Sequence, residues 1–103
     1  MAGSGQDYNT AVGSGAARYY STGTDFLTQS SQGVYIGSDT RASANSISNE
    51  IAIGYGAVGG GSDTITLGNS SVDLLRIPGL NATSGQVLTY DTTAGGFKAA
   101  ASG

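Results

Sequence analysis

The stretch NEIAIGYGAVGGGSDTITLGN, residues 49–69, decides the fold. Its segments 51–53 and 65–67 alternate large apolar residues with small or polar ones, which is the period-two pattern of β-strands. The glycines between them have the G-x-G-x-x-G spacing of a dinucleotide-binding turn, but that turn requires a helix next. Poor helix formers and then β-branched residues follow instead. The stretch therefore predicts two strands joined by glycine corners and no nucleotide site.

The same pattern occurs four times along the chain and ends each time in a glycine. AVG ends at Gly13, VYIG at Gly37, IAIG at Gly54 and ITLG at Gly68, so the steps are 24, 17 and 14 residues. Recurrence at such short periods is typical of a solenoid, in which each coil stacks on the next. So short a coil needs tight corners with left-handed backbone, which glycine adopts most cheaply. We therefore predict turn corners at Gly13, Gly37, Gly54, Gly56, Gly59 and Gly68.

The large aliphatic residues of these strands share one face. The chain has only 19 Leu, Ile, Val and Phe residues among 103. Ordering a chain of this length costs on the order of 150 kcal/mol of conformational entropy, which so few large apolar side chains cannot easily offset alone. We therefore expect the coils to share a core with copies of the chain around a common axis. The predicted shared core is Val12, Val34, Ile36, Ile51, Ile53, Ile65 and Leu67.

Breaks in the repeat predict the domain organisation. We expect a leader or linker at 1–8, β-roll repeats at 9–71 with insertions at 18–33 and 38–49, a connector at 72–84, a β-hairpin at 85–100 and a tail at 101–103. The hairpin comprises strands at 86–90 and 97–99 around a glycine-containing turn. A lone hairpin is marginal in water, so we expect it to serve as a cap or connector with partner chains.

The first insertion, RYYSTGTDFLTQSSQG, is too apolar for a free loop because it contains Tyr19, Tyr20, Phe26 and Leu27. We expect it to pack over the coil or against a neighbouring chain. Exposed aromatic rings stack on sugars and on protein surfaces, so Tyr19 and Tyr20 are candidate receptor contacts. The alternative is that these tyrosines only pack between chains or beneath the insertion.

Composition argues against several classes of function. Without cysteine or histidine, the chain has no disulfide scaffold, thiolate zinc site or cysteine nucleophile. Its net charge is −3 and its four Lys and Arg residues are scattered, unlike the basic stripe of a nucleic-acid binder. No apolar run approaches the roughly 18 residues of a membrane span. The calcium nonapeptide pattern fails because Ser62 stands where that pattern has glycine. We predict no metal, no cofactor, no nucleic-acid partner and no membrane insertion.

Catalysis would have to depend on carboxylates. Glu50 and Asp63 are nearly one coil apart, so a solenoid could bring them together, and glycoside hydrolysis would require them to face each other across a cleft. The interpretation we favour is that Asp63 caps the turn before its strand, while Glu50 pairs with an arginine of a neighbouring chain. We therefore predict that the chain is not an enzyme.

Residues 49–69 resemble the repeats in the heads of trimeric autotransporter adhesins, with their N-x-V/I-A-I-G strand followed by glycine and alanine. The longer run from VYIG through TRASAN to TITLGN, residues 34–69, is similar to bacteriophage tail fibres and tail spikes of the group that often ends in an endosialidase-type intramolecular chaperone. GQVLTYDTTAGGF, residues 85–97, resembles a hairpin of phage fibres. The pattern covers about 9–97 without the chaperone or an adhesin stalk, so we expect an excised fibre segment or a short fibre protein.

This resemblance implies an all-β, trimeric, left-handed parallel β-roll with a C-terminal β-hairpin, and the shared core then becomes a trimer core. It implies a structural homotrimeric segment of a phage tail fibre, located in the virion and taking part in host attachment. The implied partners are copies of the chain, other fibre or virion proteins and a host-surface glycan. Two alternatives stay open: a glycan- or surface-protein-binding head module, and the subunit of a self-assembling extracellular filament.

Overall fold

The structure is a computed structural model that describes residues 6–21 and 25–101. The chain forms two compact units, of which the first ends at Asp73 and the second begins at Leu74. Within the described residues both units consist of β-strands and connecting turns, and the one helical element is the 3₁₀ turn η1 (Pro78–Leu80). The prediction of an all-β protein is therefore confirmed.

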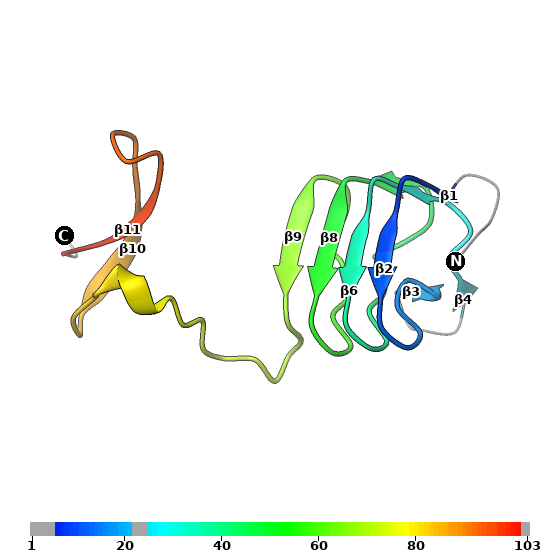
Figure 1. Cartoon of the computed structure of the whole chain (residues 1–103), viewed down its shortest axis with the longest axis horizontal. Helices are drawn as coiled ribbons and strands as arrows, with labels where there is room; N and C mark the ends of the chain where they lie inside the picture. The colour runs from blue at the N-terminus through cyan, green and yellow to red at the C-terminus, as the bar shows by residue number, and fades with distance from the viewer. Residues whose placement is uncertain (1–5, 22–24, 102–103) are drawn as a thin grey trace. The chain divides into compact units, whose positions relative to one another are not determined.

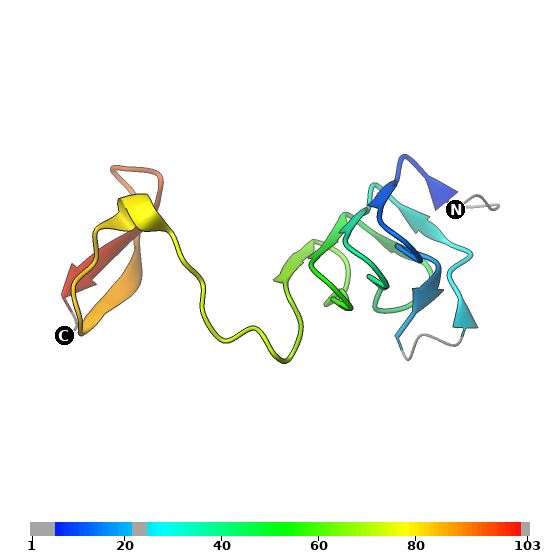
Figure 2. The same ribbon diagram turned by 60° about the horizontal axis from the view of Figure 1, so that its bottom comes forward.

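Parallel strands form two sheets in the first unit, with the orders β2-β6-β8-β9 and β1-β5-β7. In the first three repeats the chain leaves a short strand of the second sheet and enters a longer strand of the first, whereas β9 has no such short strand before it; the repeats lie side by side (Figures 1 and 2). The strands of these sheets are β1 (Gln6–Asp7), β2 (Thr10–Val12), β5 (Ser30–Ser31), β6 (Val34–Ile36), β7 (Ile47–Ser48), β8 (Glu50–Ile53) and β9 (Thr64–Leu67).

The residue offsets between paired strands of the four-stranded sheet equal the spacings of the sequence repeat. Thr10 pairs with Val34, Val34 with Ile51, and Ile51 with Ile65. Pairing therefore advances by the 24, 17 and 14 residues that separate the glycine-ending segments. Because each offset places equivalent residues side by side, the glycine that ends each strand also stacks on the next glycine.

This glycine ladder consists of Gly13, Gly37, Gly54 and Gly68. All four have positive φ angles, of 126°, 125°, 124° and 87° in chain order. A Cβ atom on Gly37 would lie 2.8 Å from the carbonyl carbon of Gly54, and one on Gly13 would lie 2.7 Å from that of Gly37. Positive φ therefore favours glycine at all four positions, and the close approach of the adjacent coil adds a second reason at Gly13, Gly37 and Gly54; a Cβ atom on Gly68 would instead meet the side chain of Val72.

The two other predicted glycine corners differ from each other. Gly56 has a φ of 63° and open space where a side chain would stand, so it is a conformational corner. Gly59 does not have a positive φ, and a Cβ atom there would overlap the carboxylate of Glu50. The expectation of a left-handed corner is thus wrong for Gly59. Glycine is needed there because a side chain would occupy the space of the buried Glu50 carboxylate.

A second row of left-handed residues precedes the long strands and contains no glycine. Tyr8, Gln32, Asn49 and Asp63 occupy equivalent places in successive coils, with φ angles of 60°, 55°, 57° and 62°. Asn and Asp tolerate this region, whereas Tyr and Gln pay a steric cost. The amide of Asn49 also donates to Asp63 Oδ1 at 2.8 Å, which joins two of these corners.

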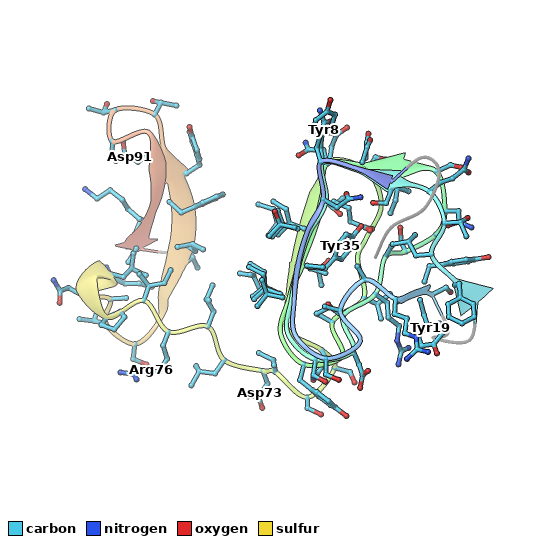
Figure 3. The ribbon with its side chains drawn as sticks, turned by 45° about the vertical axis from the view of Figure 1, so that its right-hand side comes forward. Tyr8, Tyr19, Tyr35, Asp73, Arg76 and Asp91 are labelled. Carbon is cyan, nitrogen blue, oxygen red and sulfur yellow. The ribbon has the colours of Figure 1, made fainter. Side chains whose placement is uncertain are left out.

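The interior of the first unit is narrow and filled mostly by alanine. On β6, the Tyr35 side chain points into it and is fully buried (Figure 3). On β8, Ala52 occupies the paired position and is also fully buried. The buried apolar cluster consists of Ala17, Leu27, Tyr35, Ala42, Ala52 and Ala57, with Ala11, Tyr20 and Ile47 packed against it.

The two insertions contribute to this interior. In the first, β3 (Tyr19–Tyr20) pairs antiparallel with β4 (Asp25–Phe26), and the next residue, Leu27, is only 5% exposed. The second insertion forms part of the coil wall, because Thr40 and Ala42 are fully buried within it. Both insertions therefore contribute buried residues beside the sheets.

The second unit is dominated by an antiparallel hairpin of β10 (Gln86–Asp91) and β11 (Gly96–Ala101). Asp91 organises its turn: the Ala94 N–H donates to Asp91 Oδ1 at 2.9 Å, and the Gly95 N–H donates to the Asp91 carbonyl at 2.8 Å. Gly95 supplies the positive φ of 78° that this turn requires. The strands extend one residue beyond the predicted ones at Asp91 and Gly96 and two residues beyond at Ala101.

Candidate assembly surface

The outer face of the four-stranded sheet carries two parallel rows of large aliphatic residues. Side chains alternate along a strand, so residues flanking the inward Tyr35 and Ala52 point outward. Strand register then aligns these residues across the coils. One row is Val34, Ile51 and Ile65, and the other is Val12, Ile36, Ile53 and Leu67. We call these seven residues the aliphatic face, and they are the residues predicted to form the shared core.

Much of this face is exposed in the single chain. Val12, Ile65 and Leu67 are 58%, 67% and 57% exposed, and the more central Ile36 and Ile53 are 38% and 36% exposed. Full burial of a Val, Leu or Ile side chain contributes ~1.5–3 kcal/mol, so a half-exposed one retains roughly 1 kcal/mol of unrealised burial free energy. The large aliphatic residues of the four-stranded sheet thus lie outside the coil, while its interior is filled mostly by alanine.

The three-stranded sheet has no row of exposed aliphatic residues among its described side chains. On β7, Ile47 packs against the buried cluster, while on β5 it is Ser30 that is buried. Their neighbours Ser31 and Ser48 alternate to the outer side. The exposed aliphatic rows are therefore a property of the four-stranded sheet. Contiguous exposed apolar patches of this kind mark interaction sites.

A series of hydrogen-bonded polar side chains, Ser30, Tyr35 and Glu50, crosses the interior behind the four-stranded sheet. Glu50 is fully buried, and its Oε1 accepts a hydrogen bond from the Tyr35 hydroxyl at 3.0 Å. The Ser43 N–H donates to both carboxylate oxygens at 3.2 Å, and the Gly61 N–H donates to Oε2 at 2.8 Å. Tyr35 Oη also lies 3.2 Å from Ser30 Oγ. The carboxylate therefore bonds to groups from both neighbouring coils.

Burial raises the pKa of Tyr35 from 10.0 to about 12. The hydrogen bond with Ser30 acts in the opposite direction, whereas the negative charge of Glu50 and the hydrogen bond to it add to the increase. The Tyr35 hydroxyl is therefore neutral over the whole physiological range and can donate its hydrogen bond to Glu50. Sequence analysis missed this pair, although one signal was present: Glu50 lies two residues before Ala52 and so shares its inward side.

The structure does not bring Glu50 and Asp63 together at a cleft. Glu50 lies inside the coil, whereas Asp63 is exposed and accepts its hydrogen bond from Asn49. The predicted pairing of Glu50 with an arginine of another chain is also wrong, because donors of its own chain satisfy the buried carboxylate. Asp63 occupies a left-handed turn position directly before β9, as expected of a turn residue.

The two candidate receptor tyrosines have different environments. Tyr19 forms an aromatic pair with Phe26, with ring centroids 5.1 Å apart, and the Arg18 guanidinium carbon lies 5.1 Å from the Tyr19 centroid and 5.7 Å from that of Phe26. Tyr20 instead packs against the buried apolar cluster, and its backbone forms an isolated β-bridge with Ala42. Only Tyr19 therefore belongs to an outward cluster, which we call the arginine–aromatic cluster.

Comparison of the chain with family models, curated proteins and solved structures finds no match. Among residues 6–21 and 25–101, no three acidic side chains form a group that could hold a metal ion. No helix in the described part of the chain is long and apolar enough to cross a membrane.

Proposed function

We propose that this chain is a structural segment of a homotrimeric fibre, of the phage tail-fibre type, that takes part in host attachment. In this proposal the stacked coils form a left-handed β-roll, and the aliphatic faces of three chains meet around the fibre axis. The observation that carries the proposal is the placement of large aliphatic residues outside the coil and alanine inside it. The sequence resemblance to phage fibres and adhesin heads supports the number of chains and the location in a virion.

Such a segment acts mechanically and through multivalency. Parallel strands stacked along an axis transmit load through backbone hydrogen bonds, and three chains present three copies of every surface loop. Weak contacts presented together gain avidity because the second and third contacts form at high effective concentration. Strong binding by any one loop is not required.

The direct test is the mass of the full chain in solution, measured by light scattering, with Ile53→Asp and Val58→Asp as a matched pair. Both residues are 36% exposed. Val58, however, lies outside the aliphatic face, where its backbone forms an isolated β-bridge with Arg41. In an assembled trimer, Ile53→Asp loses apolar burial and introduces a desolvated charge, which together cost at least ~2 kcal/mol per chain. Three chains then lose ~6 kcal/mol of association free energy, so assembly weakens about 10⁴-fold. We expect three-chain mass for the wild type and Val58→Asp, and dissociation of Ile53→Asp.

Two results would count against the proposal. A compact monomer at micromolar concentration would show that the aliphatic face is not an interface between copies. Much larger, polydisperse mass would favour the filament alternative, because β2 and β9 each leave one strand edge unpaired in the described sheet.

A second candidate function, recognition of a surface glycan, is favoured by the arginine–aromatic cluster. Aromatic faces stack on sugar rings, and the guanidinium of Arg18 beside them can bind acidic groups. The test is glycan-array binding by the wild type, Tyr19→Ala and Tyr55→Ala, where Tyr55 is a 68% exposed tyrosine outside the cluster. Binding that survives Tyr55→Ala but not Tyr19→Ala would support recognition, whereas equal binding by all three would exclude this role for Tyr19.

A further inference from the structure

Hydrogen bonds after the ladder glycines follow one rule in the first three coils. The residue directly after a ladder glycine accepts, through its carbonyl, from the residue two places after the next ladder glycine. The Asp39 N–H donates to the Ser14 carbonyl, and the Gly56 N–H donates to the Ser38 carbonyl, both at 2.9 Å. These bonds join the corner of each coil to the corner of the next.

The chain departs from this rule after the last ladder glycine. There the rule assigns the Ser70 N–H to the carbonyl of Tyr55, but this carbonyl accepts from Asn69 Nδ2 at 2.6 Å. The Oδ1 atom of Asn69 accepts from the Ser71 N–H at 2.8 Å, and the Asn69 carbonyl accepts from the Val72 N–H at 3.0 Å. A side-chain amide therefore makes the bond that the backbone of a continuing coil makes elsewhere.

Val72 occupies the space beyond the last ladder glycine. A Cβ atom on Gly13, Gly37 or Gly54 would meet the backbone of the next ladder glycine, at 2.7, 2.8 and 3.0 Å respectively. A Cβ atom on Gly68 would instead meet three side-chain atoms of Val72, at 2.7 to 3.2 Å. The Val72 side chain thus fills the place that the backbone of a further coil would need, so a further strand cannot approach β9 in the register of the earlier coils.

The inward side chains of the last strand are polar. Thr64 and Thr66 on β9 pair with the inward Glu50 and Ala52 of β8, so both threonines point into the stack of coils. Glu50 and Ala52 are fully buried, whereas both threonines are only half-buried. Terminal repeats of solenoids characteristically present a polar outer side, because no further repeat covers them.

We propose that residues 69–72 form a cap that ends the stack of coils and closes its C-terminal end to a further coil, including one from a second copy of this chain. The two parts of this cap are the Asn69 amide, which satisfies the Tyr55 carbonyl, and the Val72 side chain, which covers Gly68. The inference goes beyond the proposed function and does not depend on it. It predicts that copies do not stack end to end at β9, whereas lateral association through the aliphatic face is compatible with the cap.

The test is hydrogen exchange of the full chain with one additional coil, a copy of residues 55–68, inserted at either of two places. Inserted before Asn69, the copy can stack on β9, and the cap re-forms on its last glycine. Inserted after Val72, the same copy meets the cap and should stay unstacked. We expect the backbone N–H groups of the copied strand to exchange at least about 100-fold more slowly in the first chain than in the second.

The position of the insertion is a fair comparison because the fold accepts coils of different length. Paired strands are already offset by 24, 17 and 14 residues, so the four residues of the cap do not prevent stacking by their number alone. A Val58→Ile change in the inserted copy alone distinguishes its peptides by mass from those of the original coil.

Removal of the cap provides the matched control. In the chain with the insertion after Val72, Asn69→Ala together with Val72→Gly should restore slow exchange of the copied strand. Asp73→Ala together with Leu74→Gly changes two exposed residues directly after the cap and should not restore it. Equal exchange in the two insertion chains, or no gain of protection when the cap is removed, would overturn the inference.

Light scattering of the same chains separates this inference from the proposed function. A three-chain mass with equal exchange in both insertion chains would refute the cap alone. A monomer that shows the expected difference in exchange would refute the trimer and support the cap. A monomer with equal exchange would refute both proposals.

Discussion

Replacement of the buried Glu50 by leucine should strongly destabilise the first unit. Leucine has a similar volume but no acceptor, so the hydroxyl of Tyr35 and the backbone N–H groups of Ser43 and Gly61 lose their partner. The Tyr35 hydroxyl can turn to Ser30 Oγ, 3.2 Å away, which leaves the half-buried backbone donors of Ser43 and Gly61 without their acceptor. Each buried unsatisfied donor costs ~1–3 kcal/mol, so Glu50→Leu loses ~2–6 kcal/mol from this cause.

Glutamine at the same position provides the matched comparison. Its amide oxygen can accept from Ser43 and Gly61 while its NH₂ group donates to the Tyr35 oxygen, so only about 1 kcal/mol should be lost. Both substitutions also remove the desolvation cost of a buried carboxylate, which acts in the stabilising direction. Because that gain is common to both variants, the difference between them isolates the orphaned donors, and we expect it to be about 2–4 kcal/mol.

The assay is urea unfolding followed by circular dichroism, at one fixed protein concentration because subunit association is linked to stability. Asp73→Leu is the control for loss of a carboxylate at an exposed position and should stay within ~0.5 kcal/mol of the wild type. Equal stability of Glu50→Leu and Glu50→Gln would refute the conclusion that the carboxylate holds the coils together by satisfying their donors.

Three further predictions concern the backbone corners and the buried tyrosine. Gly37→Ala should cost at least ~2 kcal/mol more than Gly56→Ala, because both have positive φ but only Gly37 has backbone of the next coil at 2.8 Å; equal unfolding midpoints would contradict this. The pKa of Tyr35 is higher in the folded chain, at about 12, than its ordinary 10.0, so its stabilising effect is complete below pH 10 and is lost as pH rises through 12. Tyr35→Phe should therefore flatten the fall in unfolding free energy across that window, and parallel pH profiles would contradict the assignment. Gln32→Asn should raise the unfolding free energy by ~0.5–1 kcal/mol in thermal melts, because asparagine tolerates the φ of 55° better; a lower melting temperature would contradict the idea that this corner is strained.

The strand register and the glycine ladder could be predicted from the sequence because both depend on local chemistry. A glycine after each alternating segment identifies where the chain turns, and the spacing of Gly13, Gly37, Gly54 and Gly68 then gives the offset between coils. Pairing of Val34 with Ile51 and Ile51 with Ile65 follows from the same offsets. The hairpin was predicted for a similar reason, since a glycine-containing turn between two alternating segments is a short-range signal.

The roles of Gly59, Gln32 and Tyr20 could not be predicted in this way. Gly59 belongs to the pattern of corner glycines, yet it is needed because the Glu50 carboxylate occupies the space beside it. Gln32 carries no sequence signal for a left-handed residue, and its conformation is imposed by its place between two sheets. Tyr19 and Tyr20 are adjacent on β3 and so point to opposite sides, but only the structure shows that Tyr20 is the one that packs against the buried cluster.

By itself, the sequence determined that this chain is all-β, where each long strand ends in a glycine, how far the chain advances between paired strands, and which residues share a strand face. Only the tertiary structure decided which of the two faces points inward. Alternation with period two defines two sides of a strand but assigns neither to the core. That choice depends on the width of the coil, which is filled by alanine, Leu27 and the Tyr35–Glu50 pair and leaves the large aliphatic side chains outside.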